Sequence, residues 1–93
     1  MSYRILYPAS YVKRAKKFLH KHPEVRSQYQ KTLELLEVNP HHPSLRLHKL
    51  EGRLSALHSV SINISYRVVL HFTMLEKEIV LVDIGGHDQV YRA

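Results

Sequence analysis

The chain has 93 residues, enough for one domain with a modest core but too few for two. It contains no cysteine, which excludes a disulfide framework, a thiol nucleophile and a cysteine-based zinc site. Lys and Arg outnumber Asp and Glu by 14 to 8, and the net charge of +6 predicts a polyanionic or acidic partner. The sequence shows neither a signal-peptide pattern nor an apolar run long enough to cross a membrane, so we expect a soluble, cytoplasmic protein with no membrane partner.

The first half of the sequence predicts one strand and two helices. Residues 2–7 form the strand, Pro8 ends it, and Ser10 is placed to cap the next helix. Pro23 ends that helix and begins a second one, which runs to about Val38. Both helices have apolar stripes at helical spacing: Tyr11, Ala15, Phe18 and Leu19 in the first, and Val25, Tyr29, Thr32, Leu33, Leu35 and Leu36 in the second. Two such stripes favour a helical hairpin packed on a sheet.

The second half predicts the rest of that sheet. Val60, Ile62 and Ile64 alternate with serines and an asparagine, the pattern of a strand with one buried and one open face. We expect a reversal near residues 63–65, because an unbroken strand would be unusually long, and a second reversal at 74–77 before an apolar strand. The predicted fold is a single α+β domain over residues 1–93, in the order β-α-α-β-β-β, with the helical hairpin on one face of a twisted, mainly antiparallel sheet.

Four segments carry a family resemblance. They are Leu47-His48-Lys49-Leu50-Glu51-Gly52, Tyr66-Arg67-Val68-Val69-Leu70, Ile79 to Ile84, and Gly85-Gly86-His87-Asp88-Gln89-Val90-Tyr91. In this order and spacing they resemble the motifs of the RelE/ParE superfamily, the toxins of bacterial type II toxin–antitoxin pairs. The two histidines and the last tyrosine are most similar to the YafQ-like branch. Ser59, Ser61 and Ser65 stand where that branch has acidic and histidine side chains.

The resemblance implies a ribosome-dependent mRNA endoribonuclease that uses no metal or other cofactor. Such a reaction needs a base for the attacking 2′-OH, an acid for the departing 5′ oxygen and a cation at the phosphate. We expect His87 and His48 to be the acid and the base, in either order, with Arg67 as the cation and Tyr91 stacking on the nucleotide. Further basic residues are candidates for RNA binding: Arg46, Lys49, Arg53, Lys13, Lys16 and Lys17.

The expected partners are a cognate antitoxin, mRNA and the ribosome, with operator DNA contacted only through the antitoxin complex. Two alternatives stay open: a ParE-like inhibitor of DNA gyrase, and a degenerate toxin that only binds its antitoxin. The candidate residues also have structural interpretations, in which Arg67 pairs with Asp83, His87 is a turn residue and Tyr91 closes the core. Two histidine pairs, His20 with His22 and His41 with His42, could suggest a metal site. We expect none, because no cluster of carboxylates or cysteines accompanies either pair.

Overall fold

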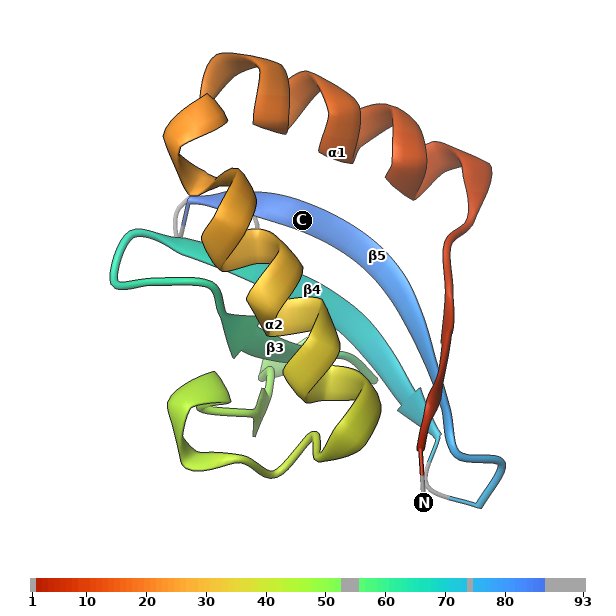
Figure 1. Cartoon of the computed structure of the whole chain (residues 1–93). Helices are drawn as coiled ribbons and strands as arrows, with labels where there is room; N and C mark the ends of the chain where they lie inside the picture. The colour runs from red at the N-terminus through yellow and green to blue at the C-terminus, as the bar shows by residue number, and fades with distance from the viewer. Residues whose placement is uncertain (1, 53–55, 74, 87–93) are drawn as a thin grey trace.

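The computed structural model describes residues 2–52, 56–73 and 75–86. Within these residues, helices cover one face of a sheet, as Figure 1 shows and as the sequence predicts. The elements are β1 (Arg4–Leu6), α1 (Ala9–Lys21), α2 (Arg26–Val38), β2 (His48–Lys49), β3 (His58–Ser61), β4 (Tyr66–Thr73) and β5 (Glu78–Gly86). A 3₁₀ turn at Pro23–Val25 joins the helices, and another at Pro43–Leu45 follows α2. Pro23 ends α1 as predicted, but it begins this 3₁₀ turn, and the second α-helix itself begins at Arg26.

The strands lie in the order β1-β5-β4-β3-β2. β1 is parallel to β5, whereas the other neighbouring strands are antiparallel, so the predicted α+β fold with a mainly antiparallel sheet is confirmed. The sequence did not predict β2 as a strand. Two paired residues are too few to show an alternating pattern, and the pairing itself, His48 with Ser59 and Lys49 with His58, is visible only in the structure.

The main core lies between the helices and the sheet. Both predicted helical stripes are confirmed, since Tyr11, Ala15 and Phe18 of α1 and Thr32 and Leu36 of α2 are buried. They pack against the helix-facing residues of the two longest strands: Val68, Leu70, Ile79, Leu81 and Ile84. The hydroxyls of Tyr11 and Tyr29 are 2.7 Å apart and join the two helices. Burial, and then this hydrogen bond, raises the pKa of Tyr11 well above its ordinary value.

The start of α1 differs from the prediction. Pro8 is the residue that precedes the helix, and no side chain caps its first turn. Ser10 is already inside the helix, so the predicted Ser10 cap is wrong. The chain passes directly from the proline, with φ −59° and ψ 150°, into helical geometry at Ala9. The first strand is also shorter than predicted and covers Arg4–Leu6 only.

The predicted reversal between β3 and β4 is confirmed. The side-chain oxygen of Asn63 accepts hydrogen bonds from the backbone N–H groups of Ser65, at 2.8 Å, and Tyr66, at 3.0 Å. This arrangement closes the turn and leaves Ile64, predicted on the buried face, 97% exposed.

The predicted open face of β3 is also wrong at one position, because Ser59 is fully buried. A small second cluster covers that part of the sheet, with Leu50 and Val69 at its centre and Leu57 and Val82 packed against them. The hydroxyl of Ser59 therefore lies beneath side chains that the sequence pattern does not connect with β3.

Replacing Leu36 by alanine tests the main core. Leu36 is fully buried on α2, and its truncation leaves a cavity, so we expect the free energy of unfolding to fall by about 2–5 kcal/mol. The matched change Leu75→Ala, at a side chain that is 99% exposed, should alter it by less than about 0.5 kcal/mol. Urea denaturation followed by circular dichroism measures both, and equal losses would contradict the assigned core.

Candidate functional site

The face of β2, β3 and β4 that is turned away from the helices carries polar side chains, and we call it the distal face. Val68 packs in the main core, so Arg67, the residue before it, projects to the opposite side together with its paired neighbour Ser61. His48 pairs with Ser59, which lies two residues before Ser61 and therefore shares its side of the sheet. The structure thus brings the predicted residues His48 and Arg67 onto one face.

His48 is held in a defined orientation on this face. Its Nδ1 lies 3.1 Å from the backbone carbonyl oxygen of Arg46, and because a carbonyl only accepts, Nδ1 carries the proton. In the neutral ring the lone pair is then on Nε2, which lies 3.4 Å from the hydroxyl of Ser59. Arg46 has a left-handed backbone with φ 50°, which costs a non-glycine residue roughly 1–2 kcal/mol. In this tautomer Nε2 is the accepting nitrogen of His48, and the Ser59 hydroxyl is placed to donate to it.

Arg67 lies at a hollow of about 490 Å³ beside the β3–β4 turn. The other residues that line the hollow are Pro43, Ser44, Arg46, Ser61, Ile62, Asn63 and Ile64. Nη1 of Arg67 is buried and has no hydrogen-bond partner among the described residues. A buried donor on a charged group without a partner is unfavourable by about 1–3 kcal/mol or more. Arg67 and Arg46 both line the hollow, which therefore has two cationic side chains that can bind an anionic oxygen.

The rim of this hollow is fixed to α2 by hydrogen bonds. The side-chain nitrogen of Asn63 donates to the amide oxygen of Gln28 at 2.9 Å, and the hydroxyl of Ser61 donates to the carbonyl of Asn63 at 2.8 Å. The sequence predicts Asn63 only as a turn residue and gives no signal that Ser44 lines a hollow. A turn asparagine with both ends of its amide in use signals a fixed turn, but its partner Gln28 is 35 residues away in sequence.

The structural interpretation of Arg67 as the partner of Asp83 is wrong. In the register of β4 and β5, Arg67 lies opposite Gly85. Asp83 is instead 3.6 Å from Nη1 of Arg14 on α1. The sequence could not separate these alternatives, because the pairing depends on a register shift in β5.

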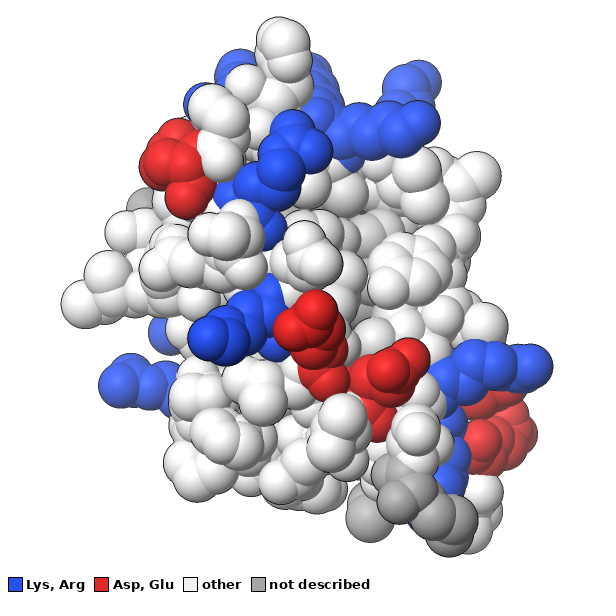
Figure 2. All heavy atoms as spheres, in the orientation of Figure 1, with Lys and Arg blue, Asp and Glu red and all other residues white. Residues whose placement is uncertain are grey.

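The predicted RNA-binding residues fall into two separate groups. Arg46 and Lys49 are exposed near His48, at the β2 edge of the sheet. Lys13, Lys16 and Lys17 are exposed on α1, which packs on β5 near the opposite edge, with β4 and β3 between the two groups. Figure 2 shows blue side chains along the part of the surface formed by α1. The structure therefore does not bring the α1 lysines to the distal face.

Three predicted residues lie outside the described residues: Arg53, His87 and Tyr91. The last described residue of β5, Gly86, pairs with Tyr66, next to Arg67. His87 follows Gly86 directly in the sequence. Because His87 lies outside the described residues, its role as acid or base stays a prediction.

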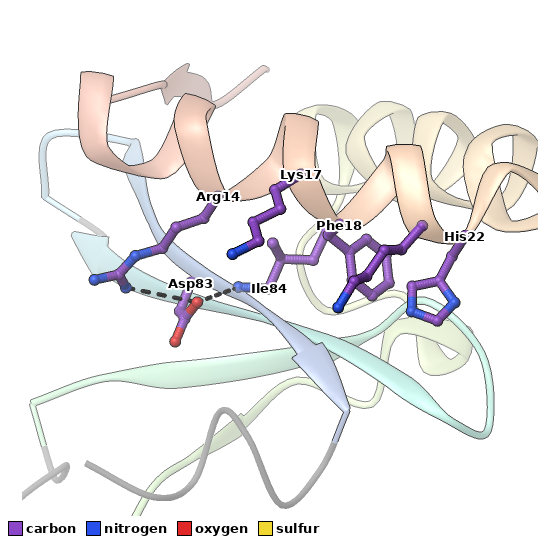
Figure 3. Close-up of a pocket in the computed structure, with 7 residues that line it drawn as sticks. Arg14, Lys17, Phe18, His22, Asp83 and Ile84 are labelled. Atoms are coloured by element: carbon purple, nitrogen blue, oxygen red, sulfur yellow. Dashed lines mark hydrogen bonds and ion pairs between the residues drawn. The ribbon is translucent and has the colours of Figure 1, made fainter.

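A second hollow of about 350 Å³ lies between α1 and β5, and we call it the seam hollow (Figure 3). It is lined by Arg14, Lys17, Phe18, Lys21, His22, Asp83 and Ile84. The carboxylate of Asp83 accepts a hydrogen bond from the backbone N–H of Ile84 at 2.8 Å, and Figure 3 shows it between that amide and Arg14. The ring of His22 packs against Phe18. Its Nδ1 is hydrogen-bonded to the hydroxyl of Tyr66 at 3.2 Å.

His58 is a half-buried histidine at the start of β3. Its ring lies edge-on to Phe72, with centroids 5.8 Å apart, and its Nδ1 is buried without a hydrogen-bond partner in the described part of the chain. Burial, followed by the positive charge of Lys49 and the nearby His48, lowers the pKa of His58 below its ordinary value of 6.5. His58 is thus neutral near pH 7 and adds no charge beside His48.

No three histidine, aspartate or glutamate side chains of the described chain converge closely enough to hold a metal ion. None of the described helices combines the length and the apolar composition that a membrane span requires.

No family model matches the sequence, and no curated protein matches it either. Solved structures do match, and they define the class of fold, that of small bacterial toxins. YafQ from E. coli strain BL21(DE3) has a TM-score of 0.78 at 15% identity, over 96% of this chain and 98% of that chain. YafQ in the E. coli DinJ–YafQ toxin–antitoxin complex gives 0.77 at 17% identity, over 98% and 99%. The Staphylococcus aureus YoeB–YefM complex gives 0.69 at 17% identity, over 94% and 99%.

The chain therefore has the fold of the RelE/ParE toxins, and in particular that of YafQ. The predicted resemblance is confirmed at the level of the fold and over nearly the whole chain. At 15–17% identity the match is carried by topology and by the arrangement of the elements, which explains why no family model matches the sequence.

The shifted histidine makes stability depend on pH. Because the pKa of His58 is lowered on folding, the unfolded chain binds the proton more tightly, and the free energy of unfolding falls as the pH drops below the ordinary pKa of 6.5. The variant His58→Phe keeps a ring against Phe72 but has no group that titrates. When the pH is lowered from about 7.5 to about 5.5, we expect its free energy of unfolding to fall by less than that of the wild type. Urea denaturation at both values measures this difference, and an unchanged pH slope would contradict the assignment.

Proposed function

We propose that the chain is the toxin of a type II toxin–antitoxin system and a ribosome-dependent mRNA endoribonuclease that acts in the cytoplasm. The observation that carries this proposal is that an oriented histidine and an arginine at an open hollow lie on the same face of the sheet. His48 and Arg67 are two strands apart across the sheet and two residues apart along it. Their Cα atoms are therefore roughly 12 Å apart. Both side chains can therefore reach one phosphodiester. The fold shared with YafQ and YoeB supports the proposal.

The proposed reaction uses the 2′-OH of the RNA as its nucleophile. Nε2 of His48 takes the proton of the 2′-OH while the 2′ oxygen attacks phosphorus. The bond from phosphorus to the 5′ oxygen breaks, and His87 donates a proton to that oxygen, which leaves a 2′,3′-cyclic phosphate and a 5′-OH. Arg67 binds the non-bridging oxygens and stabilises the added negative charge of the phosphorane. His48 is assigned as the base because its Nδ1 is already a donor to Arg46.

The remaining predicted residues bind RNA in this proposal. Tyr91 stacks on the nucleotide next to the cleaved bond. Arg46, Lys49 and Arg53 hold the phosphates on either side of it. The exposed lysines of α1 contact ribosomal RNA, which needs only clustered positive charge: Lys13, Lys16 and Lys17.

The proposed protein partner is a cognate antitoxin. Among the structurally similar proteins, YafQ was solved in complex with DinJ and YoeB in complex with YefM. A net charge of +6 suits an antitoxin with an acidic or amphipathic segment that covers the basic surface. Operator DNA would be contacted only through that complex.

Histidine substitutions test the proposed chemistry. In a reconstituted translation reaction, we expect the wild type to cut the translated message and His87→Ala and His48→Ala to be slower by about 10²- to 10⁴-fold, because each change removes a proton-transfer group. His20→Ala, at an exposed position on α1, is the matched control and should cut at the wild-type rate.

The same reaction separates the alternatives. A message with a 2′-deoxynucleotide at the cut position should resist cleavage there, because the nucleophile is missing. An intact message in the presence of wild-type protein that still stops cell growth would overturn the nuclease and favour a ParE-like action on DNA gyrase.

Replacing Arg67 tests the role of its guanidinium group. We expect Arg67→Ala to lower the cleavage rate by about 10²-fold or more, since removal of one donor to the developing charge has effects of this size. Arg67→Lys should recover only part of the rate, because an ammonium group cannot bind the phosphate in a bidentate way. Arg26→Ala on the exposed start of α2 is the control for loss of one positive charge. Equal rates in all three variants would exclude Arg67 from the site.

A further inference from the structure

A smaller hollow of about 220 Å³ adjoins the hollow of Arg67. It lies between α2, the 3₁₀ turn at Pro43–Leu45 and the end of β3, beyond the two residues of β2. Ser44 and Ser61 line both hollows, so the two depressions meet at these residues. We call them together the flank groove. It leads from Arg67 on the distal face, past the outer edge of β3, to Lys31 on α2.

Positive charge lies at both ends of the flank groove. Arg67 and Arg46 line the larger hollow, and the exposed residue Lys31 lines the smaller one. No aspartate or glutamate is among the described residues that line either hollow. An anionic group at either end of the groove can therefore bind a cationic side chain without a carboxylate in the wall to repel it.

Between these ends the groove is lined by hydroxyl groups that have already donated their protons. The hydroxyl of Ser61 donates to a carbonyl oxygen of the β3–β4 turn, and that of Thr32 donates to a carbonyl oxygen of α2 at 2.9 Å. Nδ1 of His42 accepts the backbone N–H of Ser44 at 3.2 Å and so carries no proton. The Ser44 hydroxyl, 2.8 Å from the same nitrogen, must then be the donor of that contact. Because a hydroxyl has a single proton, all three groups offer a ligand only their lone pairs.

This order of groups selects the chemistry of the ligand. The non-bridging oxygens of a phosphodiester only accept hydrogen bonds, so they match the cations at the two ends and not the hydroxyls between them. The middle of the groove needs a ligand with N–H or O–H donors. A ribonucleotide within a strand has both parts, because phosphates flank it while its 2′-OH, and the amino group of adenine, cytosine or guanine, lie between them.

We propose that the flank groove holds the ribonucleotide next to the cleaved bond, and that Ser44 and Ser61 recognise it by accepting hydrogen bonds from its amino group or its 2′-OH. Arg67 binds the cleaved phosphate at one end, and Lys31 binds the next phosphate along the strand at the other. This inference rests on the proposed function, which places the cleaved phosphate at Arg67. It goes further by naming the residues that select and hold the neighbouring nucleotide.

Apolar side chains at the groove give the base a surface on which to lie. Ile64, at the tip of the β3–β4 turn, is 97% exposed and lines the larger hollow, and Ile62 lines both hollows. A base that covers Ile64 removes apolar surface from water, which is favourable. An acidic peptide would also bring N–H donors and anionic oxygens, but its aspartate and glutamate side chains have no flat ring. The apolar surface and the continuity with the hollow of Arg67 therefore favour a nucleotide.

Three labelled oligonucleotides test which donor is recognised. They are hexa-adenylate, the hexamer of purine riboside, which lacks only the amino groups, and the 2′-deoxy form of hexa-adenylate, which lacks only the 2′-OH groups. The whole chain carries His87→Ala, so that the RNA is not cut during the measurement. By fluorescence anisotropy, we expect the ligand that lacks the recognised donor to bind about three- to tenfold more weakly than hexa-adenylate, the usual effect of losing one hydrogen bond. Loss with purine riboside assigns the donor to the base, and loss with the deoxy form assigns it to the ribose.

Substitutions in the groove show whether the hydroxyls make that contact. Ser44→Ala removes the hydroxyl and keeps the backbone N–H that binds His42, so the local turn is retained. It should weaken binding of hexa-adenylate about three- to tenfold and leave binding of the ligand without the recognised donor unchanged, whereas a merely structural role would weaken both. The control Ser10→Ala, on the exposed side of α1, should have no effect. Lys31→Ala should weaken binding at least about threefold more than Arg26→Ala, which removes a charge of α2 that lines neither hollow.

Several outcomes overturn the inference. Equal binding of the three oligonucleotides, or an equal effect of Ser44→Ala on all of them, would mean that the hydroxyls recognise no donor. Tighter binding of a labelled hexaglutamate than of hexa-adenylate, weakened in Lys31→Ala, would make the groove a peptide site. Failure here is distinguishable from failure of the nuclease proposal, because binding is measured without cleavage. Message that is cut by the wild type, together with equal binding of the three ligands, would remove this inference alone, and intact message would remove the nuclease.

Discussion

The register of β4 between β3 and β5 is the constraint on which the rest of the molecule depends. Along this strand Val68 and Leu70 face the main core, and Arg67 and Val69 face the other way. A shift by one residue would exchange the two sets and place a guanidinium group in the core, which is strongly unfavourable. The same apolar residues that stabilise the fold therefore also fix the side of the sheet on which Arg67 meets its paired neighbour Ser61.

β5 uses an irregularity to serve the core and the seam hollow together. Its register with β4 shifts between Val69 and Leu70, so that Leu81 and Ile84, three residues apart, both contact the main core. The extra residue breaks the simple alternation and leaves Asp83 at the seam with Arg14. Because β1 ends at Leu6, no described strand pairs with the outer edge of the bulged half of β5, and α1 packs against β5. The seam hollow follows from these two features.

The periodicity of apolar residues was sufficient to predict most of the fold, but it did not predict how residues pair across the sheet. The helical stripes and the long strands have patterns that local sequence carries, and the two helices, β4 and β5 were predicted accordingly. The two-residue β2 has no pattern, and the burial of Ser59 departs from the alternation of its own strand. In the candidate site, His48 and Arg67 were found through motifs. The contact between His48 and the backbone carbonyl of Arg46 was not predicted. Arg46 has a left-handed backbone there, and the sequence gives no signal of that conformation.

The two candidate residues of the distal face are held with unequal firmness. Arg67 lies on a strand whose neighbours on both sides are paired and whose core residues are fully buried. His48 lies on an edge strand of two residues, which the hydrogen bond from Leu50 to Leu57, at 2.9 Å, and the small cluster around Leu50 hold against β3. Local opening of a two-residue edge strand costs less than global unfolding, because the main core stays packed. The position of the histidine relative to the arginine is set by this small cluster, so the cluster, rather than the main core, limits how well the site is preorganised.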